Sequence, residues 1–199
     1  MFKVSEYENI LILDTETTGL NPDVDCPIEV GAVLWNIQHG TLQCWSAVIQ
    51  SDVVGPTWIH GINEELAALG TPRDQVYKGL EKLVSFSDAI VAHNAVFDKN
   101  MLPELNSTWI DSMDIEWPRK SNRKDLVSIA LAHGVPVTSA HRALSDCLIL
   151  VNLFERAQEL GLDVPHALER AARPKVLIQS FQSFEDNHLA KEAGFRWKG

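Results

Sequence analysis

The chain has 199 residues, of which 45% are hydrophobic and 22% are charged. This length and composition suit one globular domain with a sizeable core and a small appendage. No apolar run approaches the roughly 20 residues that a membrane-spanning helix needs. The first ten residues also carry acids where a signal peptide has its apolar stretch. We therefore expect an intracellular, cytoplasmic protein with no membrane segment.

The formal net charge of −10 argues against an extended basic surface of the kind that binds phosphate backbones. It does not exclude an enzyme that reaches phosphates through divalent cations, because such a site needs a local excess of carboxylates. Three cysteines, Cys26, Cys44 and Cys147, are widely spaced and form no CxxC pair. We expect reduced thiols, and neither a disulfide framework nor a zinc cluster is indicated.

Strands are predicted first along the chain. Residues 10–13 form a short apolar run, residues 28–35 (IEVGAVLW) are rich in β-branched side chains, and residues 42–49 are a third candidate. Residues 36–40 are a plausible hairpin connection between the last two strands. These three strands would form the antiparallel start of a sheet.

Strands and helices then alternate, which indicates an α/β domain with a mixed sheet. Further buried strands are predicted at residues 88–93 and 108–113. Gly161 marks the end of this pattern, so we divide the chain into a domain at residues 1–161 and a small C-terminal module at residues 162–199. The predicted helices of the first domain span residues 63–70, 71–86, 95–105, 124–133 and 141–160.

Two carboxylates stand at the end of the first strand, where ILILD continues into TETTGL. Asp14 and Glu16 are two positions apart, so on a strand their side chains point to the same face. Carboxylates that close repel each other unless a cation lies between them, and Mg²⁺ takes oxygen ligands in this kind of pocket. The alternative is a pair of solvated acids in a turn.

Two further segments carry candidate residues at element ends. Asp98, in HNAVFD, falls in the first turns of a helix, where an acid also complements the helix dipole. His141 and Asp146, in HRALSDC, would lie about 140° apart around a regular helix, which is wrong for two ligands of one metal ion. They can meet if His141 precedes the helix on a loop and folds back. Otherwise Asp146 would be a helix acid paired with a basic residue.

In this order, DTETTG, HNAVFD and HRALSDC resemble the three motifs of the DEDDh 3′→5′ exonucleases, the superfamily of the DNA polymerase III proofreading subunit. The likeness covers about residues 8–160, and lesser matches are PIEVGAV from Pro27, HGI from His60 and Asp111 in WIDSM. The stretch from VAHNAVFD to WIDSM looks most like the exodeoxyribonuclease ten branch. The resemblance implies a ribonuclease H-like mixed β-sheet flanked by helices.

The resemblance also implies roles for the matching residues. Two Mg²⁺ or Mn²⁺ ions would activate a water and stabilise charge on the departing 3′ oxygen. His141 would take the proton from that water, a role that suits an imidazole near neutral pH. The implied activity is that of a 3′–5′ exodeoxyribonuclease that releases nucleoside 5′-monophosphates from DNA 3′ ends, in DNA repair or replication. The implied metal ligands are Asp14, Glu16, Asp98 and Asp146.

Several residues are expected to lie against the terminal nucleotide, with the backbone amides of the turn after the first strand near its sugar. Leu20 would wedge against a base, unless it is a loop hydrophobe that closes the core. Asn94 would contact the substrate, brace the metal loop or simply cap a helix. The expected substrate-binding residues are Thr15, Thr17, Thr18, Gly19, Leu20, His60 and Asn94.

The expected partner is nucleic acid, as single-stranded DNA or as DNA 3′ ends. The densest basic run, PRKSNRKD, would hold the DNA backbone leading into the site, or else be a solvated loop. Two rival functions remain open. One is an RNA exonuclease of the same fold, since no residue reads a 2′-hydroxyl unambiguously. The other is an inactive fold used as a binding module, which would have no need for four converging acids.

The C-terminal module has a thinner pattern. We expect a helix through Ala172, a short strand at residues 175–179 and a small helix in EDNHLAKEAGFRWKG. The module could dock on the first domain or bind a protein partner. It could also touch nucleic acid through Arg196, Trp197 and Lys198.

Overall fold

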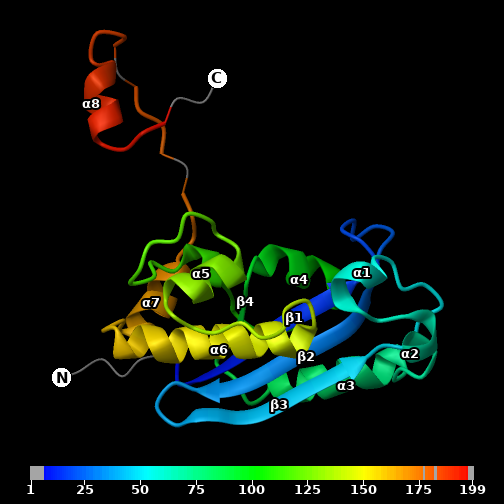
Figure 1. The fold of residues 1–199 in the computed structure, drawn as a ribbon. Helices are drawn as coiled ribbons and strands as arrows, with labels where there is room; N and C mark the ends of the chain where they lie inside the picture. The colour runs from blue at the N-terminus through cyan, green and yellow to red at the C-terminus, as the bar shows by residue number, and fades with distance from the viewer. Residues whose placement is uncertain (1–6, 177, 182, 197–199) are drawn as a thin grey trace.

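The computed structural model describes residues 7–176, 178–181 and 183–196. It shows one mixed sheet of five strands in the order β3-β2-β1-β4-β5, with helices on both faces (Figure 1). The predicted α/β class with a ribonuclease H-like mixed sheet is confirmed. The strands are β1 (Asn9–Thr17), β2 (Pro27–Asn36), β3 (Gly40–Val48), β4 (Ala89–Ala92) and β5 (Trp109–Asp111).

The strand β1 lies at the centre of the sheet. It pairs antiparallel with β2 and parallel with β4, and β3 and β5 form the two edges. Four successive residues of β1, Ile10, Leu11, Ile12 and Leu13, are at most 1% exposed, because helices cover both faces. This double burial explains why the run is continuously apolar rather than alternating.

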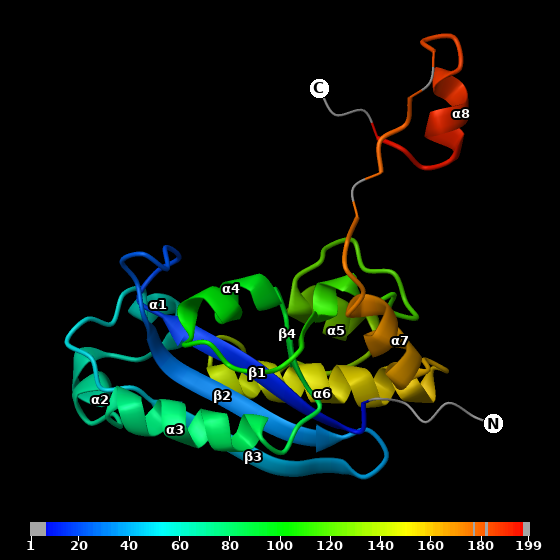
Figure 2. The ribbon, with the colours of Figure 1, turned by 180° about the vertical axis from the view of Figure 1, so that it is seen from behind.

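The helices form two layers around the sheet. The long helix α6 packs across β2 and β1 on one face, and α3 packs on the other face (Figure 2). The helices are α1 (Thr57–His60), α2 (Glu64–Ala68), α3 (Arg73–Val84), α4 (Ala95–Met101), α5 (Leu126–Ala132), α6 (Ala143–Glu159), α7 (Val164–Ala171) and α8 (Asn187–Glu192), with a 3-10 helix at Ser112–Asp114.

Alternate side chains of β1 enter two separate hydrophobic cores. Ile10 and Ile12 belong to the core under α6, together with Trp35 and Phe154. Leu11 belongs to the core under α3. The rings of Trp35 and Phe154 stack with their centroids 5.5 Å apart, which joins α6 to β2. The core under α6 therefore holds the helix that carries one of the candidate carboxylates.

Replacing Phe154 with alanine is expected to lower the free energy of unfolding by about 3–5 kcal/mol, because the ring is fully buried and its removal leaves a cavity. Urea denaturation followed by circular dichroism measures this loss. The control is Phe86→Ala, at a phenylalanine that is 53% exposed after α3, where we expect a change of about 0.5 kcal/mol or less. Equal losses in the two variants would contradict the assignment of Phe154 to the core.

Packing continues past Gly161, after which we placed the domain boundary. Val164 and Leu168 of α7 are buried in the core under α6, and α7 also contacts β5. An amphipathic helix needs such a partner for its apolar face. The division of the chain after Gly161 stays a prediction, but the core of the first domain includes α7.

The strand predicted at residues 175–179 is wrong for the described residues of that range, which lie outside any strand or helix. Val176 and Ile178 are 76% and 68% exposed, and within the described chain no sheet edge pairs with them. A lone strand without such a partner is not stable in water. The next helix, α8, has no buried residue and stands away from the sheet (Figure 1). Trp197 and Lys198 lie outside the described residues.

Candidate active site

Three carboxylates meet where β1 passes under the start of α6. Asp14 and Glu16 come from β1, and Asp146 comes from the first turn of α6. One carboxylate oxygen from each of the three lies within 4.8 Å of the other two. The expectation that Asp14 and Glu16 share one face is therefore confirmed, and α6 supplies a third acid to that face.

Asp98 approaches the same place from α4. It lies in the first turn of this helix and is 1% exposed. Its Oδ1 accepts a hydrogen bond of 2.8 Å from the Oγ1 hydroxyl of Thr15, which lies between the two acids of β1. The predicted substrate residue Thr15 is itself only 7% exposed. Its side chain therefore orients Asp98 rather than standing open to a ligand.

His141 precedes α6 and does not belong to it. It adopts the left-handed backbone conformation with φ of 63°, and its backbone N–H donates to Asp146 Oδ2 at 3.1 Å. The helix that was predicted from residue 141 begins at Ala143, with Arg142 as its N-cap. The folded-back arrangement is thus the one observed, and it removes the geometric objection to pairing His141 with Asp146. The imidazole is exposed beside the acids.

Burial raises the pKa values of all four acids, and repulsion between the carboxylates of the site adds to this effect at Asp14 and Glu16. Burial is the largest cause at Asp14, whose pKa is well above its usual value, and the charges of Asp98 and Asp146 raise it further. Burial and then Asp146 raise the pKa of Glu16 to about 7. Burial also raises the pKa of Asp98 and of Asp146. A hard divalent cation would relieve this repulsion, and a donor set made only of carboxylate oxygens fits such an ion.

We expect the metal-free protein to lose stability as the pH rises from about 4.5 to about 7. In that window the unfolded chain ionises Glu16, whose ordinary pKa is 4.5, while the folded protein keeps it protonated up to about 7. The folded state therefore binds more protons, and stability falls with pH through this window. Thermal melts in a chelator at pH 5 and pH 8 measure the effect, and Glu16→Gln should reduce the slope. An unchanged slope in Glu16→Gln would contradict the raised pKa.

The turn after β1 is held by its own side chains. Thr17 Oγ1 donates to the Gly19 carbonyl oxygen at 2.6 Å, and Thr18 Oγ1 donates to Asp25 Oδ1 at 2.9 Å. A Cβ at Gly19 would lie 2.4 Å from the Asp25 carboxylate, so a larger residue there would displace the side chain that holds the turn. These hydroxyl groups shape the turn, and their direct contact with substrate stays a prediction. Leu20 is 82% exposed, so the alternative that it closes the core is wrong.

Two other predicted substrate residues differ in their surroundings. His60 is only 2% exposed, and its Nδ1 accepts the Ile62 N–H at 3.0 Å. Burial lowers its pKa, so a neutral ring that supports the HGI turn is the role this structure gives it. Asn94 is exposed, has a left-handed φ of 69° and makes no side-chain cap bond, while its N–H donates to Asp111 Oδ1 at 3.0 Å. Its side chain therefore remains available to a ligand.

The sequence indicated no role for three further residues, of which Glu29 and Arg142 lie beside Asp146. Glu29 of β2 is 3% exposed and forms an ion pair with Arg142, the residue that follows His141. An acid inside the apolar stretch PIEVGAV was the available signal, because a buried carboxylate needs a partner. Trp58 of α1 is 84% exposed. No pattern in the sequence distinguishes an exposed tryptophan from a core one.

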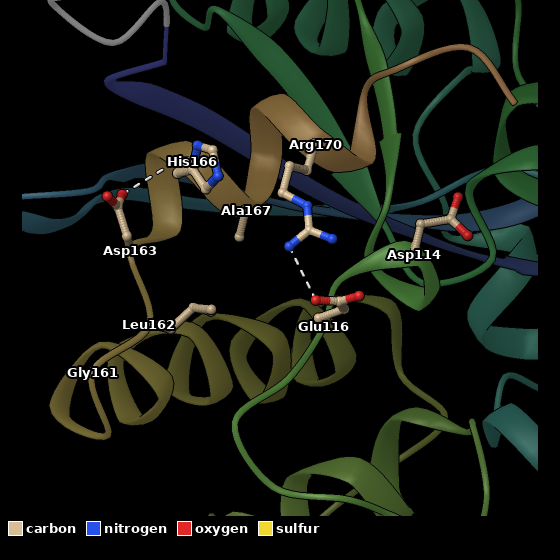
Figure 3. A pocket seen from close by; sticks show the side chains of 8 residues that line it. All are labelled: Asp114, Glu116, Gly161, Leu162, Asp163, His166, Ala167 and Arg170. Atoms are coloured by element: carbon tan, nitrogen blue, oxygen red, sulfur yellow. Dashed lines mark hydrogen bonds and ion pairs between the residues drawn. The ribbon is translucent and has the colours of Figure 1, made fainter. Parts of the chain in front are cut away.

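A separate cavity of about 240 Å³ lies between α7 and the end of α6 (Figure 3). Its charged groups already have partners: Arg170 pairs with Glu116 at 3.0 Å, and Asp163 accepts the His166 backbone N–H at 3.1 Å. Asp146 lies at the opposite end of α6, about 20 Å away for a helix of this length. The cavity is therefore not part of the carboxylate site.

The ribonuclease H-like sheet and the acids gathered from β1 and α6 are consistent with the metal site of a DEDD-type nuclease. The model of the exonuclease family named for RNase T matches residues 11–154, most of the chain. The chain therefore belongs to this family, the DnaQ-like DEDD 3′–5′ exonucleases, and is a 3′–5′ exonuclease. Across the described residues, no helix has the length and apolarity needed to cross a membrane.

Several relatives show the same likeness. The DNA polymerase III subunit epsilon of Treponema pallidum is 28% identical, over 92% of this chain and 93% of the relative. The PolC-type DNA polymerase III of Thermotoga petrophila is 31% identical over 78% of this chain, which spans only 12% of that protein. The structure of exonuclease X in complex with 5′ overhanging duplex DNA is 27% identical, with a TM-score of 0.65 over 82% of this chain and 97% of the other. The E. coli exonuclease I structure, at 18% identity and a TM-score of 0.63 over 76% and 42%, supports the fold alone.

Proposed function

We propose that this protein is a metal-dependent 3′–5′ exodeoxyribonuclease that releases nucleoside 5′-monophosphates from DNA 3′ ends during repair or replication. The observation that carries the proposal is the convergence of Asp14, Glu16 and Asp146 within 4.8 Å, with Asp98 beside them. DNA as the substrate is supported by the duplex-DNA complex of exonuclease X and by the epsilon subunit of T. pallidum.

The residues of the site divide the work between them. The four acids would hold two Mg²⁺ or Mn²⁺ ions, which when bound supply an activated water and neutralise charge on the phosphate. His141 is exposed and its backbone N–H contacts Asp146, so its imidazole would be the group that takes the proton from the attacking water. Thr15 keeps Asp98 turned towards the site through its hydroxyl.

Two exposed apolar side chains would contact the bases. Leu20 follows the turn after β1, and Trp58 lies on α1, which stands beside that turn in both views (Figures 1 and 2). Gly55 joins the two segments closely, since a Cβ there would lie 2.1 Å from the Thr18 carbonyl oxygen. Apolar side chains in such a place stack on bases without reading the sequence. The two side chains would bind the terminal nucleotides by stacking on the faces of the bases.

Removing these side chains is expected to weaken DNA binding more than it slows the chemical step. Stacking of one base on an aromatic side chain is worth about 1–3 kcal/mol, so Trp58→Ala should raise KM several-fold or more, and Leu20→Ala should act in the same direction. Steady-state kinetics on single-stranded oligonucleotides measure both. The control is Leu42→Ala, at a leucine of β3 that is 55% exposed on the edge of the sheet. Equal KM values in all three variants and the wild type would contradict this base contact.

The basic run would hold the DNA backbone. Arg119, Lys120, Arg123 and Lys124 are exposed, and His93 at the end of β4 ties this segment to the sheet through a 2.8 Å contact of Nε2 with the Lys124 carbonyl oxygen. The charges are therefore attached to the same end of β4 that leads into α4. Such a segment supplies phosphate contacts that an otherwise acidic surface lacks.

One experiment tests the proposed substrate and reaction. The purified protein is incubated with 3′-labelled single-stranded DNA, duplex DNA with a 5′ overhang, and RNA of the same sequence, each with Mg²⁺, with Mn²⁺ and with a chelator. We expect metal-dependent release of labelled 5′-monophosphates from DNA. Preference for RNA would replace the substrate, and no release in any metal would overturn the proposed activity.

A further inference from the structure

We propose that Glu29 and Gly31 of β2 form a seat that sets the position of the first turn of α6, and that Glu29, acting through Arg142, is a positioning residue for the nuclease reaction. The seat would place Asp146 against the acids of β1 and hold the loop that carries His141. This inference rests on the proposed function of the carboxylate site, and it assigns no metal ligand beyond those already named.

The first half of the seat is a buried, fully bonded carboxylate. Arg142 donates from Nη2 to Glu29 Oε1 at 2.6 Å and from Nε to Glu29 Oε2 at 2.9 Å. The Ala143 backbone N–H donates to Glu29 Oε2 at 3.1 Å. The Glu29 side chain is 4% exposed and that of Arg142 is 41% exposed. A two-point guanidinium pair fixes orientation as well as distance, so it holds the chain on both sides of the helix start.

The second half of the seat is the absence of a side chain at Gly31. This residue lies two positions along β2 from Glu29, on the same face. A Cβ there would lie 2.3 Å from the Ala143 carbonyl carbon and 2.3 Å from the Leu144 nitrogen. The Cys147 thiol also donates to the Gly31 carbonyl oxygen at 3.3 Å. The first turn of α6 therefore rests on the backbone of β2, and any larger residue would lift it.

These contacts lead directly to the reacting groups. The Asp146 backbone N–H donates to the Arg142 carbonyl oxygen at 3.0 Å, and Asp146 Oδ2 accepts the His141 N–H at 3.1 Å. Arg142 thus stands between the acid and the histidine in a closed ring of contacts. The register of the sheet supports the arrangement, because Glu29 pairs with Glu16 and Gly31 pairs with Asp14. The strand that seats α6 is the neighbour of the strand that carries the other acids.

A role of Arg142 through its charge and a role through its position predict opposite changes in metal affinity when the residue is replaced. Removing a cation beside carboxylates should strengthen divalent metal binding if the pair acts only through its charge. If Arg142 positions α6, its removal should weaken metal binding, because Asp146 is no longer held against Asp14 and Glu16. Groups that orient metal ligands typically change metal affinity or activity by about 10–100-fold.

The experiment measures Mn²⁺ affinity by titration calorimetry, kcat and KM on single-stranded DNA, and the melting temperature. The variants are Arg142→Gln, Arg142→Lys, Glu29→Gln and the double variant of Glu29→Gln with Arg142→Gln. The matched control is Arg170→Gln, which breaks the distant pair with Glu116. We expect Mn²⁺ affinity and kcat to fall by about 10–100-fold in the first three and not in the control. The double variant should lose little more than either single one, because the two residues act as a unit.

Three outcomes would overturn the inference. Tighter Mn²⁺ binding in Arg142→Gln would show that the pair acts through its charge. Full activity in Arg142→Lys would show that the two-point geometry is not needed. A lower melting temperature with unchanged Mn²⁺ affinity and kcat would show that the pair has a purely structural role. Gly31→Ala gives an independent check and should weaken Mn²⁺ binding even though it changes no charge. If the wild type bound Mn²⁺ but cleaved no nucleic acid, the proposed function would fail, while the affinities would still decide the seat.

Discussion

Asp146→Asn is expected to lower kcat by about a thousandfold or more while the protein stays folded. Metal ions and preorganised charge supply several kcal/mol of transition-state stabilisation, and the rate falls exponentially as this stabilisation is lost. Asparagine keeps the size of the side chain and an oxygen that can accept the His141 N–H. The loss would therefore report the missing carboxylate charge. Asp14→Asn should act alike, since Asp14 shares the same cluster.

The same substitutions should leave the metal-free protein as stable as the wild type, or more so. Burial and the neighbouring acids already disfavour the ionised form of Asp14, so removing its charge relieves a cost. Single-turnover cleavage measures the rate of the chemical step, Mn²⁺ titration measures metal affinity, and thermal melts in a chelator measure the stability of the metal-free protein. Glu159→Gln, near the far end of α6, is the control and should cleave normally. Near wild-type cleavage by Asp146→Asn in Mg²⁺ would show that the metal-site interpretation is wrong.

His141→Asn is expected to lower kcat by about 10²–10⁴-fold, the usual contribution of a general base, with little change in Mn²⁺ affinity. Asparagine is chosen because it tolerates the left-handed backbone at this position, where φ is 63°. It also keeps the backbone N–H that donates to Asp146. Alanine at residue 141 should lose activity too, but it adds backbone strain to the loss of the imidazole.

The discriminating measurement is the pair of kcat and Mn²⁺ affinity on one preparation. Removing a proton acceptor that binds no metal should lower kcat and leave the Mn²⁺ affinity unchanged. If Mn²⁺ affinity fell in His141→Asn as far as it does in Asp146→Asn, His141 would be a ligand rather than the base. The rate of the variant should also rise with pH, because hydroxide replaces the missing base.

Local patterns were enough to predict much of the fold and the two acids of the first strand. Strand periodicity places Asp14 and Glu16 on one face, and β1 confirms it, because side-chain direction on a strand depends only on position. The continuous apolar run before Asp14 indicates a strand buried on both faces. The family motifs add Asp98 and Asp146, which no local rule would have joined.

The features of the site that the sequence did not predict depend on contacts between distant segments of the chain. Nothing near Glu29 in the sequence indicates a partner 113 positions away, and the Arg142 pair forms only because α6 crosses β2. The same crossing leaves no room for a Cβ at Gly31. The helix also begins at Ala143 rather than at His141, where the sequence pattern had placed its start. The strand predicted at residues 175–179 fails for the converse reason, since the apolar pattern is present but no sheet edge in the described chain receives it.

The central strand, the α/β class and the candidate acids could be predicted before folding is considered, because they follow from short-range periodicity and motif order. How the acids are held depends on contacts between distant elements: a hydroxyl from Thr15, a backbone bond from His141 and the contacts of β2 with the start of α6. Side-chain direction within one element is a local property. The distance between two elements is set by what packs between them, and at the start of α6 that is the backbone of Gly31.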